Sequence, residues 1–150
     1  MTRRHGLIPI ALALTVLCGG ASAAWAQTFP NMKGAWTGTS RSIVLGPAPH
    51  HKDNPAARAV GGDVRLSEMK FTITVEGQEG NRFWGHISSS VMTEPLIGAF
   101  SSDGKRFRIV QRQNGMLDGV MSGADKFETF YSDAKPNLIA VGVTEYTRER

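Results

Sequence analysis

The chain has 150 residues and a formal net charge of +4, and 41% of its residues are hydrophobic. This length is typical of one domain. Basic and acidic residues are interspersed along the chain, whereas nucleic-acid-binding proteins usually concentrate positive charge on one face. The composition therefore argues against a nucleic-acid-binding protein.

The first 26 residues have the organisation of a cleavable secretory signal. Arg3 and Arg4 precede an uncharged apolar run over residues 7–17, and small residues lead to Ala24-Trp25-Ala26 before Gln27. The apolar run is shorter than the about 20 residues that span a bilayer. We therefore predict a signal peptide at 1–26, a mature domain at 27–150 and a periplasmic or secreted location. A buried N-terminal helix is the alternative.

Cleavage at this point changes the chemistry of the mature chain. It leaves 124 of the 150 residues and removes Cys18, the one cysteine, so no disulfide or thiolate ligand remains. Arg3 and Arg4 are lost too, which lowers Lys plus Arg from 17 to 15 against 13 acidic residues, a net charge of +2. No later apolar run is long enough for a stable membrane span.

After Gln27 the pattern predicts eight β-strands, because short runs of alternating apolar and polar residues recur between turn-forming residues. In chain order they cover 33–45, 64–76, 82–90, 95–101, 105–112, 116–122, 126–132 and 137–147. Most connections are short, and two contain Asp103-Gly104 and Asn114-Gly115, dipeptides typical of tight hairpins. The fold predicted is all-β, an eight-stranded antiparallel up-and-down β-barrel. Closing the sheet into a barrel leaves no exposed edge strands. An open meander or a two-sheet sandwich is the alternative.

The alternation also predicts which side chains face inward. The apolar row, predicted to fill most of the interior, is Phe71, Ile73, Val75, Phe83, Ile87, Phe107, Ile109, Leu117, Met121, Phe127, Ile139, Val141 and Val143. The polar row, predicted to face outward, is Thr72, Thr74, Arg82, Trp84, His86, Arg106, Arg108, Asp118 and Glu128.

The first predicted strand opens with Gly34-Ala35-Trp36, and Arg148 follows the last strand. This Gly-x-Trp start resembles that of the calycin barrels, the group of the lipocalins, fatty-acid-binding proteins and avidins. The resemblance implies that Arg148 packs over Trp36 and closes one end of the barrel. Eight alternating strands place both residues at the same end, which agrees with this expectation.

The avidin-like branch of that group has further residues with which this sequence can be compared. Ser42 stands where a biotin-binding serine would, but Gly38 replaces the expected asparagine. Only Trp36 and Trp84 remain of the tryptophans in the mature chain, so the biotin-enclosing box is missing. Biotin binding is not expected.

A ligand site is predicted at the end opposite Trp36. The long loop at 46–63 lies there, and four polar residues fall on inward positions of nearby strands: Ser42, Ser89, Gln111 and Tyr131. A mostly apolar pocket with a few convergent polar groups is the usual form of a small-molecule site. The alternative is that these four are solvated residues of the barrel rim.

Other polar residues are given no role in chemistry. His50 and His51, with Asp53 nearby, are predicted to lie in a solvated loop, since no second ligand cluster accompanies them. His86 is predicted to be a surface histidine without a nucleophile or an orienting acid. No metal and no cofactor are predicted.

These observations favour an exported barrel that binds a small, largely apolar molecule without catalysis. The alternative is a secreted interaction or inhibitor module, acting through the 46–63 loop or through an outer face with Trp84 and several arginines. A third hypothesis is a barrel enzyme, for which Tyr131, Glu94 and His86 would be the available acids or bases.

Overall fold

The computed structural model describes residues 28–46, 50 and 57–150. The predicted signal peptide and half of the predicted long loop, including His51 and Asp53, lie outside the described residues. Within the described part of the chain, no helix is long and apolar enough to cross a membrane.

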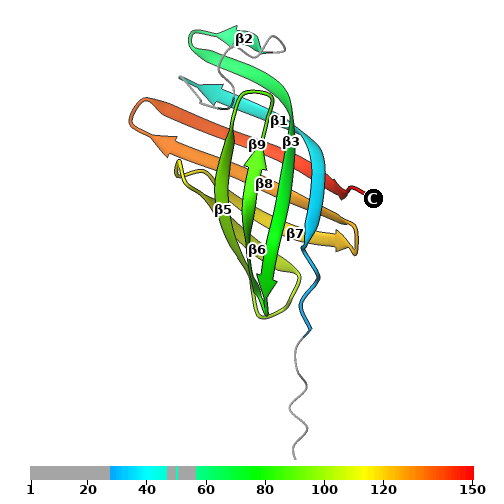
Figure 1. Ribbon diagram of the computed structural model, residues 1–150. Coiled ribbons are helices and arrows are strands. Elements are labelled where there is room, and N and C mark those ends of the chain that lie inside the picture. Colours follow the sequence, from blue (N-terminus) through cyan, green and yellow to red (C-terminus); the bar gives the residue numbers. More distant parts are fainter. Residues whose placement is uncertain (1–27, 47–49, 51–56) are drawn as a thin grey trace, which may run out of the picture.

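Nine strands form one sheet: β1 Gly34–Leu45, β2 Arg58–Gly61, β3 Val64–Glu79, β4 Arg82–Ser88, β5 Thr93–Phe100, β6 Arg106–Gln111, β7 Met116–Gly123, β8 Lys126–Lys135 and β9 Leu138–Arg148. From β3 to β9 each strand pairs antiparallel with the next, because short turns join them. β1 pairs with β9 on one side and with β3 on the other, which closes an eight-stranded barrel (Figure 1). The predicted up-and-down barrel is therefore confirmed.

The ninth strand, β2, is an addition to that barrel. Its four residues pair with the first residues of β3, beyond the region where β3 pairs with β4. This segment was predicted to be part of the long loop, because residues 46–63 are rich in Pro, Ala and Gly. All four residues of β2 are exposed, so no alternation of burial accompanies the strand.

We call the end of the barrel that holds Trp36 and Arg148 the base, and the opposite end, with the turns at 89–92 and 112–115, the mouth. The segment before β1 crosses the base and fills it. Met32 is fully buried, its N–H donates to Gln78 Oε1 at 2.7 Å, and its carbonyl accepts from Trp36 Nε1 at 2.8 Å. The base is thus closed by the chain itself.

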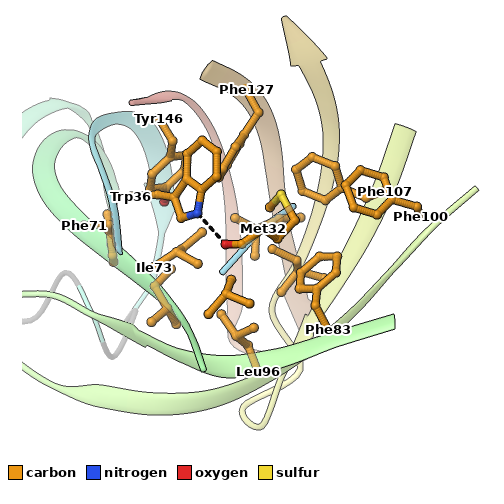
Figure 2. Close-up of a cluster of buried hydrophobic side chains, with 14 of the residues drawn as sticks. Met32, Trp36, Phe71, Ile73, Phe83, Leu96, Phe100, Phe107, Phe127 and Tyr146 are labelled. Carbon is orange, nitrogen blue, oxygen red and sulfur yellow. Dashed lines mark hydrogen bonds between the residues drawn. The ribbon is translucent and has the colours of Figure 1, made fainter. Parts of the chain in front are cut away.

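Aromatic rings pack together inside the base half of the barrel (Figure 2). The ring of Phe127 lies between those of Trp36, Tyr146 and Phe107, at centroid distances of 4.8, 5.0 and 5.2 Å. Phe83 and Phe100 extend the cluster from β4 and β5. Burial of such large apolar surfaces is the main source of stability in a domain without disulfides.

The inward face predicted for the last strand is wrong. Ile139 and Val143 are 52% and 40% exposed, and Val141 shares their side, whereas Leu138, Ala140 and Tyr146 are buried. Met121 of β7 is only partly buried. The other predicted interior residues lie inside the barrel, where the structure describes them as buried.

Candidate functional site

The barrel interior changes from apolar at the base to polar at the mouth. The buried polar side chains are Ser40, Ser42, His50, Ser67, Glu94, Gln111, Thr129, Asp133 and Thr144. They come from β1, β3, β5, β6, β8 and β9 and from the loop after β1. Buried polar groups cost free energy unless they are hydrogen-bonded, so this concentration needs an explanation.

His50 lies at the centre of the mouth and is only 7% exposed. Its Nε2 is 2.8 Å from Glu94 Oε1, and its Nδ1 is 3.1 Å from Ser89 Oγ. The centroid of its ring lies 5.3 Å from that of the Phe71 ring, in an edge contact. The prediction that His50 belongs to a solvated loop is therefore wrong. The pairing joins residues 44 apart in the chain, a distance that no local sequence pattern reports.

Backbone groups fix both partners of His50. Glu94 Oε2 accepts the N–H of Gln113 at 3.0 Å, and Ser89 Oγ accepts the N–H groups of Val91 and Met92 at 3.2 and 3.4 Å. A carboxylate only accepts, so Nε2 carries a proton toward Glu94. In the neutral ring, Nδ1 then accepts the hydroxyl proton of Ser89.

Serine, histidine and glutamate in a hydrogen-bonded row invite comparison with hydrolase triads, in which the histidine takes the proton of a serine that faces the substrate. Ser89 instead lies inside a turn, where its oxygen accepts two backbone N–H groups. It does not line the cavity beneath His50. The geometry of this row therefore holds the imidazole in place.

A small cavity lies beneath the His50 ring. Its volume is about 20 Å³, and its lining combines polar and apolar side chains: Ser40, His50, Phe71, Ile87, Gln111, Leu117, Tyr131, Thr144 and Tyr146. About 10–15 Å³ on this measure accommodates one water molecule. The interior is thus mostly filled, and the His50 side chain takes up part of the mouth.

The structure brings three of the four predicted ligand residues to this place. Gln111 and Tyr131 line the cavity directly, and Ser89 holds His50 above it. Ser42 is buried one step away, bonded through its hydroxyl to that of Ser40 at 2.9 Å. The predicted ligand site did not include His50, which was assigned to a solvated loop, or Glu94, which was named only as an acid or base of the enzyme hypothesis. Glu94 shares the face of β5 with Leu96, and a charge on an inward row is itself a signal.

Tyr131 and Asp133 make the wall of β8 polar. Burial raises the pKa of Tyr131, and the nearby carboxylates of Asp133 and Glu94 raise it further. Asp133 Oδ2 accepts from Lys135 Nζ at 2.7 Å. Asp133 Oδ1 and Thr129 Oγ1 are buried without a hydrogen-bond partner among the described residues.

Several other candidates lie away from the mouth. His86 faces outward on β4, as predicted, and its Nδ1 is 2.9 Å from Glu76 Oε1. Among the described residues, no group of three or more His, Cys, Asp or Glu side chains is placed to hold a metal ion. At the base, Arg148 Cζ lies 3.9 Å above the Trp36 ring, the contact that the calycin resemblance implies.

Comparison with known proteins identifies no family. No family model matches the chain, and no curated protein matches it. A solved surface lipoprotein shares 14% identity over 80% of this chain and 66% of its own, with a TM-score of 0.41. The S-type phycobiliprotein lyase CPES from Guillardia theta shares 10% identity over 79% of this chain and 89% of its own, with a TM-score of 0.36. At these values neither structure supports an argument about function.

Proposed function

We propose that this protein is an exported barrel that binds one small molecule at its mouth and does no chemistry on it. The observation that carries the proposal is the cluster of buried polar side chains around a cavity, in a barrel whose opposite end is closed by its own chain. Stability alone would favour an apolar interior, since buried polar groups contribute little or cost free energy.

The lining suits a largely apolar molecule with one polar end. Phe71, Ile87 and Leu117 offer apolar surface, whereas Gln111 and Tyr131 offer hydrogen-bond donors and acceptors. Small-molecule sites usually combine a mostly apolar lining with a few placed polar groups.

The size of the cavity sets a condition on binding. A volume of about 20 Å³ holds little more than water, so a larger ligand displaces a lining side chain. We infer that this is His50, the lining residue that a loop rather than a strand carries. Removing His50 from Glu94 leaves a buried carboxylate without its partner, which costs about 3–5 kcal/mol unless the ligand replaces the contact. Affinity therefore depends on what the ligand offers to Glu94.

Native mass spectrometry of the protein purified from its own host tests the proposal. We expect an added mass in a one-to-one ratio, released by solvent extraction. Ser40→Leu, which fills the cavity, should abolish it. Thr39→Leu is the matched control, because Thr39 is the exposed neighbour on the same strand and should leave the added mass unchanged. An added mass that survives Ser40→Leu would place the ligand elsewhere.

A second function is favoured by a different observation, an apolar stripe on the outside of the barrel. Trp84, Ile97, Val110 and Met116 are 46%, 66%, 41% and 42% exposed, and cross-strand pairing places them side by side over β4 to β7. The arginines expected to assist them are instead paired with acids, Arg106 with Asp103 and Arg108 with Asp118 among them. An interaction module would use the stripe itself.

Ile97→Lys tests this alternative, because it puts a charge at the most exposed position of the stripe. Loss of a protein partner that co-purifies with the unaltered chain, with no change in the ligand mass, would favour the interaction module. Val143→Lys, on the outer face of β9, is the control, since that residue is similarly exposed but lies outside the stripe.

A further inference from the structure

We propose that the molecule held at the mouth carries a nitrogen head group, an amine or an imidazole-like ring, that replaces the His50 ring on Glu94. This inference rests on the proposed binding function and deepens it, because it names the class of ligand. The His50 side chain itself shows which chemistry the mouth accepts.

Glu94 is the group that selects the head group of the ligand. It is 4% exposed, and among the described residues its two oxygens have one donor each, Nε2 of His50 and the N–H of Gln113. When a ligand enters and the imidazole leaves, Oε1 loses its donor inside the barrel. A ligand that donates an N–H, above all from a charged nitrogen, restores a charge-assisted hydrogen bond. A hydrocarbon ligand leaves Oε1 without a donor.

The other charges at the mouth agree with this selection. Asp133 is a second buried carboxylate, 4% exposed, with one oxygen that has no partner among the described residues. The ammonium of Lys135 is already bonded to its other oxygen at 2.7 Å. A ligand carboxylate or phosphate would therefore meet two acids, which disfavours anionic head groups.

The surroundings of the His50 ring suit a flat or aromatic ligand. The centroids of the His50 and Phe71 rings lie 5.3 Å apart in an edge contact, and the adjacent cavity reaches Ile87, Leu117 and Tyr146. A ring bearing an aminomethyl group would place nitrogen on Glu94 and carbon on this apolar floor. The same arrangement accommodates imidazole where the His50 ring now lies.

The test uses three probes of similar size: benzylamine, benzyl alcohol and toluene. His50→Gly opens the space, and binding to this variant is measured by calorimetry near neutral pH. We expect benzylamine to bind at least tenfold more tightly than benzyl alcohol, and toluene to bind most weakly. Adding Glu94→Gln to the variant should reduce the benzylamine preference to about twofold or less. Imidazole should raise the Tm of His50→Gly and leave that of His50→Gly/Glu94→Gln nearly unchanged.

The outcomes separate the ligand class from the binding function. Equal or tighter binding of benzyl alcohol or toluene would overturn the nitrogen head group but leave a binding barrel. Binding of none of the probes, by the variant or by the unaltered protein, would overturn both.

The unaltered protein provides a measurement that does not depend on the folding of a variant. Benzylamine should shift the NMR signals of the His50 ring protons and raise the Tm, and benzyl alcohol should do neither. An equal response to the two probes would contradict the proposal.

Discussion

Arg148 shows how one residue joins separate parts of the base. Its guanidinium lies 3.9 Å above the Trp36 ring, its Nη groups donate to the carbonyls of Asn31 and Lys33, and its Nε donates to Asp125 at 2.8 Å. The side chain is only 20% exposed. One planar group with five N–H donors can make all of these contacts at once, which lysine cannot.

We expect Arg148→Ala to lower the free energy of unfolding by about 2–4 kcal/mol, because it removes several hydrogen bonds from a charged donor and also a cation–π contact. Arg148→Lys should recover only part of this loss. Urea unfolding provides the measurement. Arg41→Ala is the control, since Arg41 is 82% exposed in its side chain and should cost less than about 1 kcal/mol. An equal loss in both variants would contradict a special role for Arg148.

The sequence predicted the residues that meet at the base and the strand residues Gln111 and Tyr131 at the mouth, but not the pairing of His50 with Glu94. Trp36 and Arg148 could be paired in advance because strand count and a short motif both place them at one end. His50 and Glu94 could not, because His50 lies in the loop after β1 whereas Glu94 is the second residue of β5, and only the closed barrel brings them together. Inward positions of regular strands are predictable, whereas the place of a loop side chain depends on the whole fold.

At the scale of the strands, inward glycines make room for aromatic rings on the neighbouring strand. Gly119 lies opposite Phe107, and Gly98 lies opposite Phe83. A Cβ at Gly119 would be 2.2 Å from ring atoms of Phe107, and one at Gly98 would be 2.4 Å from the Phe83 ring. Aromatic residues placed over glycines in this way fill the barrel without leaving voids.

Gly119→Ala should therefore force the Phe107 ring out of its place in the aromatic cluster. Overpacking of this kind costs about 1–3 kcal/mol, which thermal unfolding would show as a lower Tm. Gly123→Ala on the same strand is the matched control, because a Cβ there meets no atom within 4 Å. Its Tm should be close to that of the unaltered protein. A Tm in Gly119→Ala that equals the control would show that the ring can move freely.

The mistake about β9 has its cause at the same scale. Its outward row, Ile139 to Val143, is more apolar than the inward Ala140 and Gly142, so alternation alone selects the wrong face. The inward row is small because neighbouring strands use the space: a Cβ at Gly142 would be 2.5 Å from Ser42 Oγ. Strand positions followed from alternation and turns, but the face of a strand depends on its neighbours in the barrel.

At the scale of the molecule, the two tyrosines of the chain report on the two halves of the barrel. Burial raises the pKa of Tyr146, which lies fully buried in the aromatic cluster of the base. Tyr131 lies at the mouth, where burial and the carboxylates of Asp133 and Glu94 raise its pKa. Each half thus holds one phenol whose pKa is raised in the folded protein.

This arrangement predicts how the protein responds to alkali. An unfolded chain releases its tyrosine protons near pH 10, whereas the folded barrel retains them at higher pH. Stability is therefore unaffected by these groups below about pH 10 and falls above it. Tyr146 alone lowers the free energy of unfolding by up to about 1.4 kcal/mol per pH unit, over the interval between its pKa in the unfolded chain and its pKa in the folded protein. Tyr146→Phe should remove this contribution.

Tyrosinate absorbance during an alkaline titration distinguishes the two halves. In Tyr146→Phe only Tyr131 reports, and because it is partly exposed at the mouth we expect it to ionise while the circular dichroism of the sheet is still intact. In Tyr131→Phe only Tyr146 reports, and we expect ionisation and loss of the sheet signal to coincide, because the closed base opens only when the barrel unfolds. Ionisation of Tyr146 in the folded protein near pH 10 would mean that water reaches the aromatic cluster, through the base or through the mouth cavity that Tyr146 also lines. The division into a closed, stabilising base and an accessible binding mouth would then be wrong.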